Sequence, residues 1–468
     1  MTDQAEGLAN DDILFGSATA AVQALRHGDV SSRELTELLL ARIAAVDPVV
    51  NAVVELRGDE ALSEADAADR AIASGAERPL LGVPLTVKDS FNVRGLHTTW
   101  GNPEARDYVA DSDATVVQQL KQAGAIIVGK SNVHFMLADY GQTANDLYGV
   151  TRNPWDTART PGGSSGGGAA ALAAAMTFLE YGSDLVGSIR IPASFCGVYG
   201  LKPSAGIVPL AGFQPPGGPP DLGAVSYMSA VGPLGRCASD LRTALAVTAG
   251  PAEPQANAYS WRLAPPRHAR LEDYRVGVVL DHERVPVSGE VGAQLSAAVD
   301  ALARAGVKIV EGWPAGVDPV RDYESFGYHV QLFFAFRQPG QDPGPAAAFV
   351  AQESRRMAAR AAWGRYFEDI DVFVCPTAFT TAFPHDSRPF EQRTIATPEG
   401  ERRYDDLPFW ISHASLPGLP AVSAPVGTTP AGLPVGAQII GPLYEDDTPV
   451  TFAGLLAGLT GGYQRPPA

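Results

Sequence analysis

The chain has 468 residues, of which 45% are hydrophobic, and its 52 Asp and Glu residues outnumber its 35 Lys and Arg residues. This length and hydrophobic content allow a large buried core, in one large domain or in a few smaller ones. The formal net charge of −17 argues against nucleic acid or an anionic membrane as the main partner, because both bind basic surfaces.

Cysteine and histidine patterns give no sign of a metal site. Cys196, Cys237 and Cys375 lack metal-binding spacing, and an odd number of cysteines without a pairing pattern is typical of a reducing compartment. The eight histidines form no HExxH motif, so we expect neither a metal nor a cofactor. The N-terminal segment lacks the apolar core of a signal peptide, and no apolar run approaches the ~18 residues of a transmembrane helix. These features predict a cytoplasmic protein that does not bind membranes.

Helical and strand-like patterns alternate along the chain. Ser31 and Glu34 form a capping-box pattern, which marks a helix start. Amphipathic runs and short apolar runs then follow one another to the C-terminus. The predicted helices are residues 17–46 (two helices), 59–74, 113–123, 290–306 and 448–459, and the predicted strands are residues 81–89, 125–129, 274–281, 307–312, 371–376, 420–427 and 435–441. The alternation predicts an α/β fold with a central mixed, largely parallel, twisted sheet covered by helices on both faces.

The segment GGSSGGG, residues 162–168, places seven small residues directly before an alanine-rich helical run. It lacks the Gly-Lys-Ser/Thr ending of a phosphate-binding loop. A flexible linker would be flanked by polar low-complexity sequence, whereas this segment lies between TRNPWD and the alanine run. A compact turn, in which the backbone approaches a reacting group, fits the pattern better.

Three spaced motifs resemble those of the amidase signature family of serine hydrolases. They are VKDSFNV around Lys88, GGSSGGG, and SDLVGSIRIPASFCGVYGLKPS over residues 183–204. Further segments also lie in the family's order, so that the resemblance covers roughly residues 15–460: YGVTRNPWD, GPLGR, DVFVCPT, LPGLPAVSAPVG and GLPVGAQIIG. The resemblance implies the amidase signature fold.

The motifs that belong together are scattered from residue 88 to about residue 440, which favours one domain. We therefore expect an N-terminal tail over residues 1–15 and a single large amidase signature domain over residues 16–468. Within this domain, the resemblance places the catalytic core at about residues 80–210 and a variable substrate-loop region at about residues 205–350.

The resemblance implies a catalytic triad of Lys88, Ser164 and Ser188, with a cis peptide bond at the relay serine, Ser164. Ser188 would attack the substrate carbonyl, and Ser164 would pass its proton to Lys88. Lys88 follows the apolar residues LTV, and its burial would favour the neutral amine that a base requires. Taken alone, such a lysine is more typical of a snorkelling surface residue, and a serine before a helix of an N-cap. The three motifs together favour catalysis.

The backbone amides of Leu185, Val186, Gly187 and Ser188, at the start of a predicted helix, are expected to form the oxyanion hole. The family usually has two glycines before the nucleophile, whereas the first is replaced here by Val186. This side chain adds bulk beside the oxyanion hole and restricts the backbone. With Leu185, it makes the site more apolar and favours hydrophobic or aromatic substrates.

By resemblance, Ser165, Asp184 and Arg190 hydrogen-bond the loop and orient the serines, although Asp184 and Arg190 could also form an ordinary ion pair. The aromatic-rich segment 324–336 fits the core, a substrate wall or a dimer face. The pocket walls are expected from three loops, at residues 130–146, 205–230 and 320–350.

These features predict an amidase, a monomer or homodimer, that hydrolyses C–N bonds of small-molecule amides through an acyl-serine intermediate. Aryl esters and carbamates (urethanes) would suit the same chemistry. One alternative is the glutamine-hydrolysing A subunit of a tRNA-dependent amidotransferase. That subunit has a tyrosine- and aspartate-containing segment near its C-terminus, and residues 404–421 of this chain differ from it. A second alternative is a non-catalytic binding module, against which the retention of the three triad residues argues.

Overall fold

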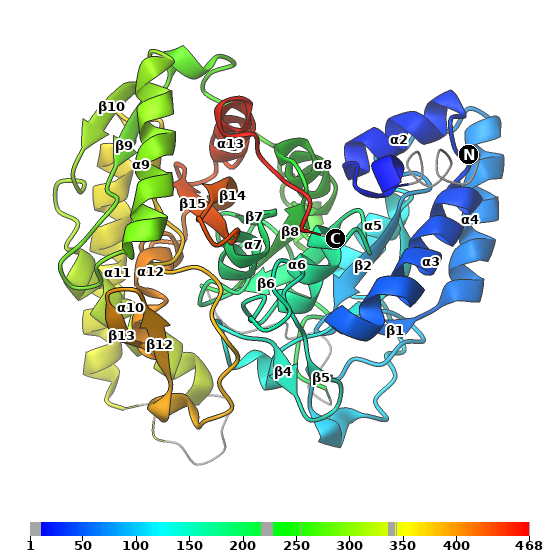
Figure 1. Ribbon diagram of the computed structural model, residues 1–468, viewed down its shortest axis with the longest axis horizontal. Coiled ribbons are helices and arrows are strands. Elements are labelled where there is room, and N and C mark those ends of the chain that lie inside the picture. The colour runs from blue at the N-terminus through cyan, green and yellow to red at the C-terminus, as the bar shows by residue number, and fades with distance from the viewer. Residues whose placement is uncertain (1–10, 217–227, 253, 336–341, 343, 468) are drawn as a thin grey trace.

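The computed structural model describes residues 11–216, 228–252, 254–335, 342 and 344–467. Residues 1–10 of the predicted tail lie outside the described residues, as do residues 217–227 and 336–341 of the predicted substrate-loop region. Figure 1 shows the strands running across the middle of the molecule, with α2, α3 and α4 at one end and α9, α10 and α11 at the other.

Eleven strands form one sheet, in the order β1-β3-β2-β6-β8-β7-β14-β15-β11-β9-β10. The strands are β1 (Val53–Leu56), β2 (Pro84–Lys88), β3 (Ile126–Ser131), β6 (Glu180–Asp184), β7 (Tyr199–Lys202), β8 (Ala230–Gly235), β9 (Arg275–Val278), β10 (Lys308–Glu311), β11 (Val372–Pro376), β14 (Ala421–Thr428) and β15 (Pro434–Ile440). Two small hairpins lie apart from it: β4 (Ala144–Asn145) with β5 (Gly149–Val150), and β12 (Thr394–Thr397) with β13 (Gly400–Arg403).

The sheet is mixed, as predicted. One flank pairs β2 in parallel with both β3 and β6, and the other flank pairs β9 in parallel with both β10 and β11. Antiparallel pairings through β8, β7, β14 and β15 join the two flanks. Parallel pairing is therefore confined to the flanks, and the α/β class expected from the helix–strand alternation is confirmed.

The helices include those predicted from the amphipathic and alanine-rich runs, whereas the helices over residues 238–248, 319–335, 346–366 and 409–415 were not predicted. The helices are α2 (Ala18–His27), α3 (Ser32–Val50), α4 (Gly58–Ala73), α5 (Thr115–Gln122), α6 (Gly166–Ala173), α7 (Arg190–Cys196), α8 (Ala238–Thr248), α9 (Gly289–Arg304), α10 (Pro319–Ala335), α11 (Ala346–Tyr366), α12 (Phe409–Ser415) and α13 (Asp447–Thr460). The predicted capping box is present at α3, where Ser31 and Glu34 satisfy each other's backbone amides.

Helices cover both faces of the sheet, and the alternation of side chains along the central strands shows how. On β14, Val422 joins the large aliphatic cluster that includes Phe452 of α13. The neighbouring residue Ala421 joins a second, aromatic-rich cluster with Ile191 of α7. Because successive strand residues point to opposite faces, α13 and α7 pack on opposite sides of the sheet.

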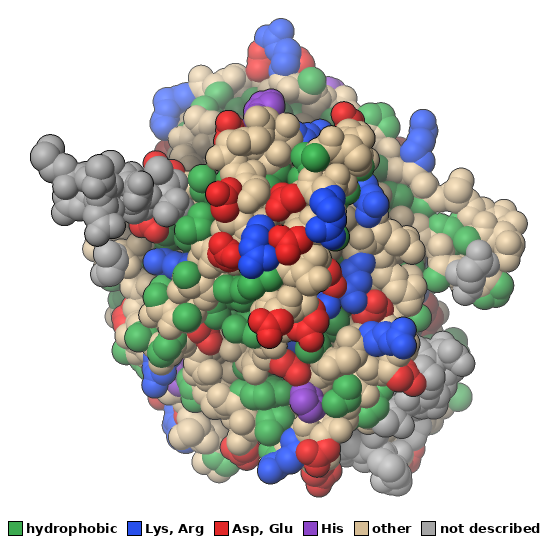
Figure 2. All heavy atoms as spheres, turned by 90° about the vertical axis from the view of Figure 1, so that its right-hand side faces the viewer, with side chains coloured by type: hydrophobic (Ala, Val, Ile, Leu, Met, Phe, Trp, Pro, Cys, Tyr) green, Lys and Arg blue, Asp and Glu red, His purple; other side chains and the backbone are tan. Residues whose placement is uncertain are grey.

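The face that carries α3 and α4 mixes acidic and basic side chains, as Figure 2 shows. Arg33 contacts both Glu37 and Asp66 there, and Arg57 contacts Glu64. The excess of acidic residues therefore does not form a single acidic patch on this face. Within the described residues, no helix combines the length and apolar character needed to cross a bilayer.

Arg236, one residue after β8, ties the N-terminal segment to the core. Its buried guanidinium donates hydrogen bonds to four carbonyl oxygens, those of Leu14, Gly16, Leu172 and Thr177. The Arg236→Met substitution would keep the apolar stem but remove these four hydrogen bonds. We expect it to lower the free energy of unfolding by about 3–5 kcal/mol, measured by urea denaturation. Arg270→Met is the control, since Arg270 is exposed; equal losses in the two variants would contradict this account.

Candidate active site

Lys88 ends β2 and lies wholly inside the protein. Its Nζ lies 2.8 Å from Ser164 Oγ, 2.8 Å from Ser165 Oγ and 2.9 Å from Ser183 Oγ. If Lys88 is an ammonium, the three hydroxyls can accept its three N–H hydrogens. If it is a neutral amine, two hydroxyls can accept its hydrogens while the third donates to its lone pair. The sequence predicted the contact to Ser164, but not the contacts of Lys88 to Ser165 and Ser183.

Burial lowers the pKa of Lys88 to about 7. The cause is the loss of water around the charged form, which the negative charges of Asp184 and Glu180 offset only in part. An amine with this pKa is substantially neutral near pH 7, and so can accept a proton. This environment agrees with the burial that the apolar residues before Lys88 predict.

The glycine-rich segment forms a tight loop before α6. The peptide bond between Gly163 and Ser164 is cis, as the family resemblance predicts. A Cβ atom on Gly163 would lie 2.1 Å from the carbonyl oxygen of Gln142, and one on Gly167 would lie 2.4 Å from that of Asn132. Glycine is therefore required at both positions because neighbouring backbone occupies the space of a side chain.

Ser188 lies two residues before α7 and lines the same cavity as Ser164. The two loops are joined by the backbone, because the Ser165 amide donates to the Ser188 carbonyl oxygen at 3.2 Å. No hydrogen bond connects the hydroxyls of Ser164 and Ser188 in the described structure. Such contacts are often long without substrate and tighten when it binds. The structure thus brings the three predicted triad residues to one place, with Lys88 bonded to Ser164.

The amides of the predicted oxyanion hole do not all face the cavity. The Gly187 amide donates to Asp184 Oδ1 at 3.0 Å, so the expected role of Gly187 as an oxyanion donor does not fit this geometry. The positive φ of Gly187, +86°, turns its amide toward that carboxylate. Among the described residues, none accepts from the amides of Leu185, Val186 or Ser188. These three amides remain candidates for the oxyanion hole.

Asp184 and Arg190 hold the loop that carries Ser188. Arg190 binds the carboxylate with two nitrogens, at 2.9 and 2.8 Å, and both side chains are fully buried. Burial alone would raise the pKa of Asp184, but the charge and hydrogen bonds of Arg190, with smaller contributions from Lys202 and the Ile189 amide, together outweigh burial and lower the pKa. Arg190 also donates to Gln438 of β15 and to Ser415 of α12, at 2.6 and 2.7 Å. The predicted pair is therefore the centre of a larger buried network rather than an isolated ion pair.

A cavity of about 460 Å³ opens onto Ser164 and Ser188. All three predicted segments contribute to its wall, but the third is not a loop, because residues 320–350 contain nearly all of α10 and the start of α11. Helix α10, which includes most of the aromatic-rich segment, provides Val330 and Phe333. The side chains from the predicted segments include Met136, Leu137, Ala138, Asp139, Tyr140, Phe213, Ser229, Ala230, Val330, Gln331 and Phe333. No sequence signal marks Trp100, Phe390 and Glu391, which complete the wall and come from outside those segments.

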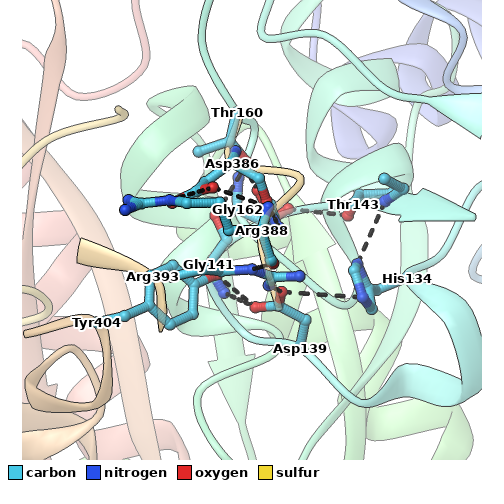
Figure 3. A network of polar contacts seen from close by, with 12 residues as sticks. His134, Asp139, Gly141, Thr143, Thr160, Gly162, Asp386, Arg388, Arg393 and Tyr404 are labelled. Atoms are coloured by element: carbon cyan, nitrogen blue, oxygen red, sulfur yellow. Dashed lines mark hydrogen bonds and ion pairs between the residues drawn. The ribbon is translucent and has the colours of Figure 1, made fainter. Parts of the chain in front are cut away.

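Asp139 lines this cavity, and Figure 3 shows the network of polar contacts around its carboxylate. Its carboxylate accepts hydrogen bonds from Arg393, from the Tyr404 hydroxyl at 2.6 Å and from the Gly141 amide at 2.8 Å. The same loop reaches the glycine segment, since Thr160 Oγ donates to the Gly141 carbonyl oxygen at 2.9 Å. Residues near 393–404 are thereby linked to the loop that carries Ser164.

The described residues contain no group of three or more His, Cys, Asp or Glu side chains placed to hold a metal ion.

Comparison with known proteins agrees with this geometry. A sequence profile of the Amidase family matches residues 34–338 and 340–449. The chain belongs to the amidase signature family. Its members hydrolyse C–N bonds, and the match extends well beyond the motifs around the triad.

Two solved structures and one curated relative show the breadth of this family. A chain from an inhibitor-bound vestigial complex, related to the origins of an s-triazine catabolic enzyme, has a TM-score of 0.83 at 28% identity and covers 97% of this chain and 100% of its own length. A 6-aminohexanoate cyclic dimer hydrolase bound to its substrate has a TM-score of 0.79 at 27% identity, covering 97% and 99%. The A subunit of the glutamyl-tRNA(Gln) amidotransferase of Synechococcus sp. (strain RCC307) is 32% identical, covering 91% of this chain and 93% of that protein.

The state of Lys88 predicts how the site responds to pH. Because its pKa is about 7 and the neutral amine is the base, the reactivity of Ser188 should rise with pH and reach half its maximum near pH 7. The rate of labelling by a fluorophosphonate, followed from pH 5 to 9, measures this. The Lys88→Met variant should label at least about 100-fold more slowly, since it lacks the base. A rate that still rises at pH 9 without levelling off, as an ordinary lysine pKa would give, would contradict the proposed state of Lys88.

Proposed function

We propose that this amidase hydrolyses small carboxylic amides with an apolar or aromatic acyl group, through an acyl enzyme on Ser188. Aryl esters and carbamates would react by the same route, because an acyl-serine mechanism accepts any carbonyl with a suitable leaving group. The observation that carries the proposal is the composition of the wall beside Ser188, which is dominated by apolar and aromatic side chains.

The aromatic part of the wall suits a flat or hydrophobic acyl group. The rings of Trp100 and Phe213 stack with their centroids 5.2 Å apart, and both line the cavity. Phe333 and Phe390 add two further rings. Burial of an apolar group against such side chains contributes about 25 cal/mol for each Å² removed from water.

The charges around the cavity argue against a free amino-acid substrate. The charged lining residues are acidic, Asp139, Asp184 and Glu391, and no described lining residue is a lysine or arginine. Asp139 and Asp184 already pair with arginines. The α-carboxylate of glutamine would therefore meet no cation in this wall, whereas a neutral acyl group needs none.

The proposed chemistry begins with the neutral amine of Lys88. Ser164 gives its proton to Lys88 while it takes the proton of Ser188, whose Oγ bonds to the substrate carbonyl carbon. The amides of Leu185, Val186 and Ser188 would donate to the oxyanion, and one such donor can lower the barrier by about 3 kcal/mol. Collapse of the tetrahedral intermediate breaks the C–N bond, and Ser164 returns a proton to the leaving amine. Water, activated by the same relay, then releases the carboxylic acid.

A second candidate function has independent support. The curated relative from Synechococcus is the A subunit of an amidotransferase, at 32% identity over nearly the whole chain. This likeness favours the glutamine-hydrolysing role, in which the same relay would release ammonia and the chain would work in a complex. The wall beside Ser188 is largely apolar and has no lysine or arginine among its described residues, which favours the stand-alone amidase. An assay can separate the two functions, because one enzyme would hydrolyse apolar amides and the other glutamine.

A substrate panel tests the proposal. We expect the purified chain alone to hydrolyse anilides of aromatic and medium-chain carboxylic acids, with kcat/KM at least about 100-fold above that for glutamine. Ser188→Ala should abolish turnover while the melting temperature stays unchanged, because a buried hydroxyl is lost without a change in packing. Release of the amine, followed by absorbance, provides the measurement.

Three outcomes would overturn this assignment. Preferential hydrolysis of glutamine, or co-purification with partner subunits, would establish the amidotransferase role instead. Equal turnover by Ser188→Ala would exclude Ser188 as the nucleophile. Failure of both the panel and fluorophosphonate labelling would identify a binding module that has lost catalysis.

Val186 should restrict the acyl group, because it lines the cavity beside Ser188. The Val186→Gly substitution removes an apolar wall and restores the glycine that is usual in the family. We expect the ratio of kcat/KM for a bulky acyl anilide to that for acetanilide to rise about 10-fold, since one or two methyl groups in a pocket change specificity on this scale. Leu137→Ala, on another part of the wall, is the matched control. An unchanged ratio in Val186→Gly would show that Val186 does not limit the acyl group.

A further inference from the structure

A second ionisable side chain lies in the buried layer that holds Lys88. Thr86 and Lys88 are two residues apart on β2 and therefore point to the same face of the sheet. The register places Thr86 beside Glu180 of β6, and Lys88 beside Ser131 of β3. Glu180 is completely buried and forms hydrogen bonds with the hydroxyls of Thr86 and, at 2.8 Å, Ser131. A carboxyl group is thus held in the same layer as Lys88 by two neutral groups.

Glu180 differs from Asp184 and Asp89, two buried acids on or next to the same strands, because no cation pairs with it in the described structure. Asp184 is neutralised by Arg190, and Asp89 lies 3.3 Å from Lys130. Lys88 gives its hydrogen bonds to three serines and makes none to Glu180. A buried carboxylate without a paired cation is unfavourable, so the carboxyl group tends to keep its proton.

We propose that Glu180 sets the protonation state of Lys88, because its carboxylate stabilises the ammonium form and so raises the pH at which Lys88 becomes the neutral base. The carboxyl and the amine share one proton in this layer. When the ammonium loses it and the carboxylate gains it, an N–H bond breaks and an O–H bond forms, and the layer keeps the same total charge. Glu180 is a positioning residue, since it acts on Lys88 through charge and does not touch the substrate. This inference rests on the proposed function of Lys88.

The titration behaviour of the two groups supports this coupling. Burial raises the pKa of Glu180 to about 7, and burial lowers the pKa of Lys88 to about the same value. The carboxylate of Glu180 favours the ammonium form of Lys88 and so opposes its action as a base. Two groups that interact in this way titrate in two steps, and each apparent pKa belongs to the pair rather than to either residue.

Other charged groups around the pair are balanced by partners. Lys130 on β3 is fully buried, and its charge is offset by Asp89. Asp184, on the same strand as Glu180, is bound by Arg190 of α7. Glu55 of β1 contacts His97. The helix packed against Glu180, α6, carries only glycine, alanine and leucine. Glu180 is therefore the acid in this layer whose charge is least offset by a partner. A change in that charge acts on the protonation state of Lys88.

The Glu180→Gln variant tests the proposal, because the amide keeps the shape and the hydrogen-bonding capacity of the carboxyl group but never carries a charge. The probe is a fluorophosphonate, and the rate of Ser188 labelling is measured from pH 5 to 9. We expect the midpoint of the rising limb to move about one pH unit lower than in the wild type, because the ammonium loses a nearby negative charge. A purely structural role would lower the rate at every pH without moving the midpoint, and would overturn the proposal.

Two further variants make the result specific. Asp240→Asn replaces another buried carboxyl group, which contacts Thr19 and Arg236 instead of the active site, and it should leave the midpoint unchanged. Thr86→Val removes a hydrogen bond that favours the Glu180 carboxylate, and it should shift the midpoint in the same direction by a smaller amount. Thr86→Val also decides the question if Glu180→Gln does not fold, and an unmoved midpoint would then overturn the proposal. If the wild type is labelled but the midpoint does not move in the variants, this inference alone is contradicted. If the wild type is not labelled at all, the proposed function is contradicted as well.

Discussion

The removal of one amine from water is the physical constraint on which this site depends. Lys88 has no exposed surface, and its Nζ forms hydrogen bonds with three serine hydroxyls. A charged ammonium is costly in such a place, so the fold itself supplies a neutral base near pH 7 without a histidine. The glycines at 163 and 167 are needed for a different reason, because the backbone of Gln142 and Asn132 occupies the space of a side chain there.

The loop that carries Ser188 is fixed by a different means, the buried charge of Arg190. This side chain joins Asp184 to Gln438 and Ser415, which belong to β15 and α12. The two parallel flanks of the sheet are joined through its antiparallel centre. Arg190 connects β6, in one flank, with β15, in the centre. The relative position of base and nucleophile is therefore set by the sheet as a whole, and breaking a buried charge network of this kind is strongly destabilising.

Much of this arrangement was predictable from the sequence, because local patterns carry it. Apolar runs and the capping box at Ser31 located most strands and helices, and the glycine–serine motif located the loop at Ser164. Contacts set by sheet register were not predictable: Ser183 and Glu180 reach the layer around Lys88 only because β6 pairs with β2. Trp100 and Phe390 line the cavity from distant segments that no motif marks. The Gly187 amide turns to Asp184 through a backbone angle that residue type alone does not reveal.

The wall provided by α10 has an evolutionary consequence. Val330 and Phe333 lie more than a hundred residues beyond the segments that carry Lys88, Ser164 and Ser188, and no hydrogen bond of the proton relay passes through them. Mutations in this helix can therefore alter which acyl groups enter while the reactive groups stay in place. Substitutions in this one helix can thus give an enzyme with this fold new substrates, nutrients or xenobiotics among them, without loss of the catalytic residues.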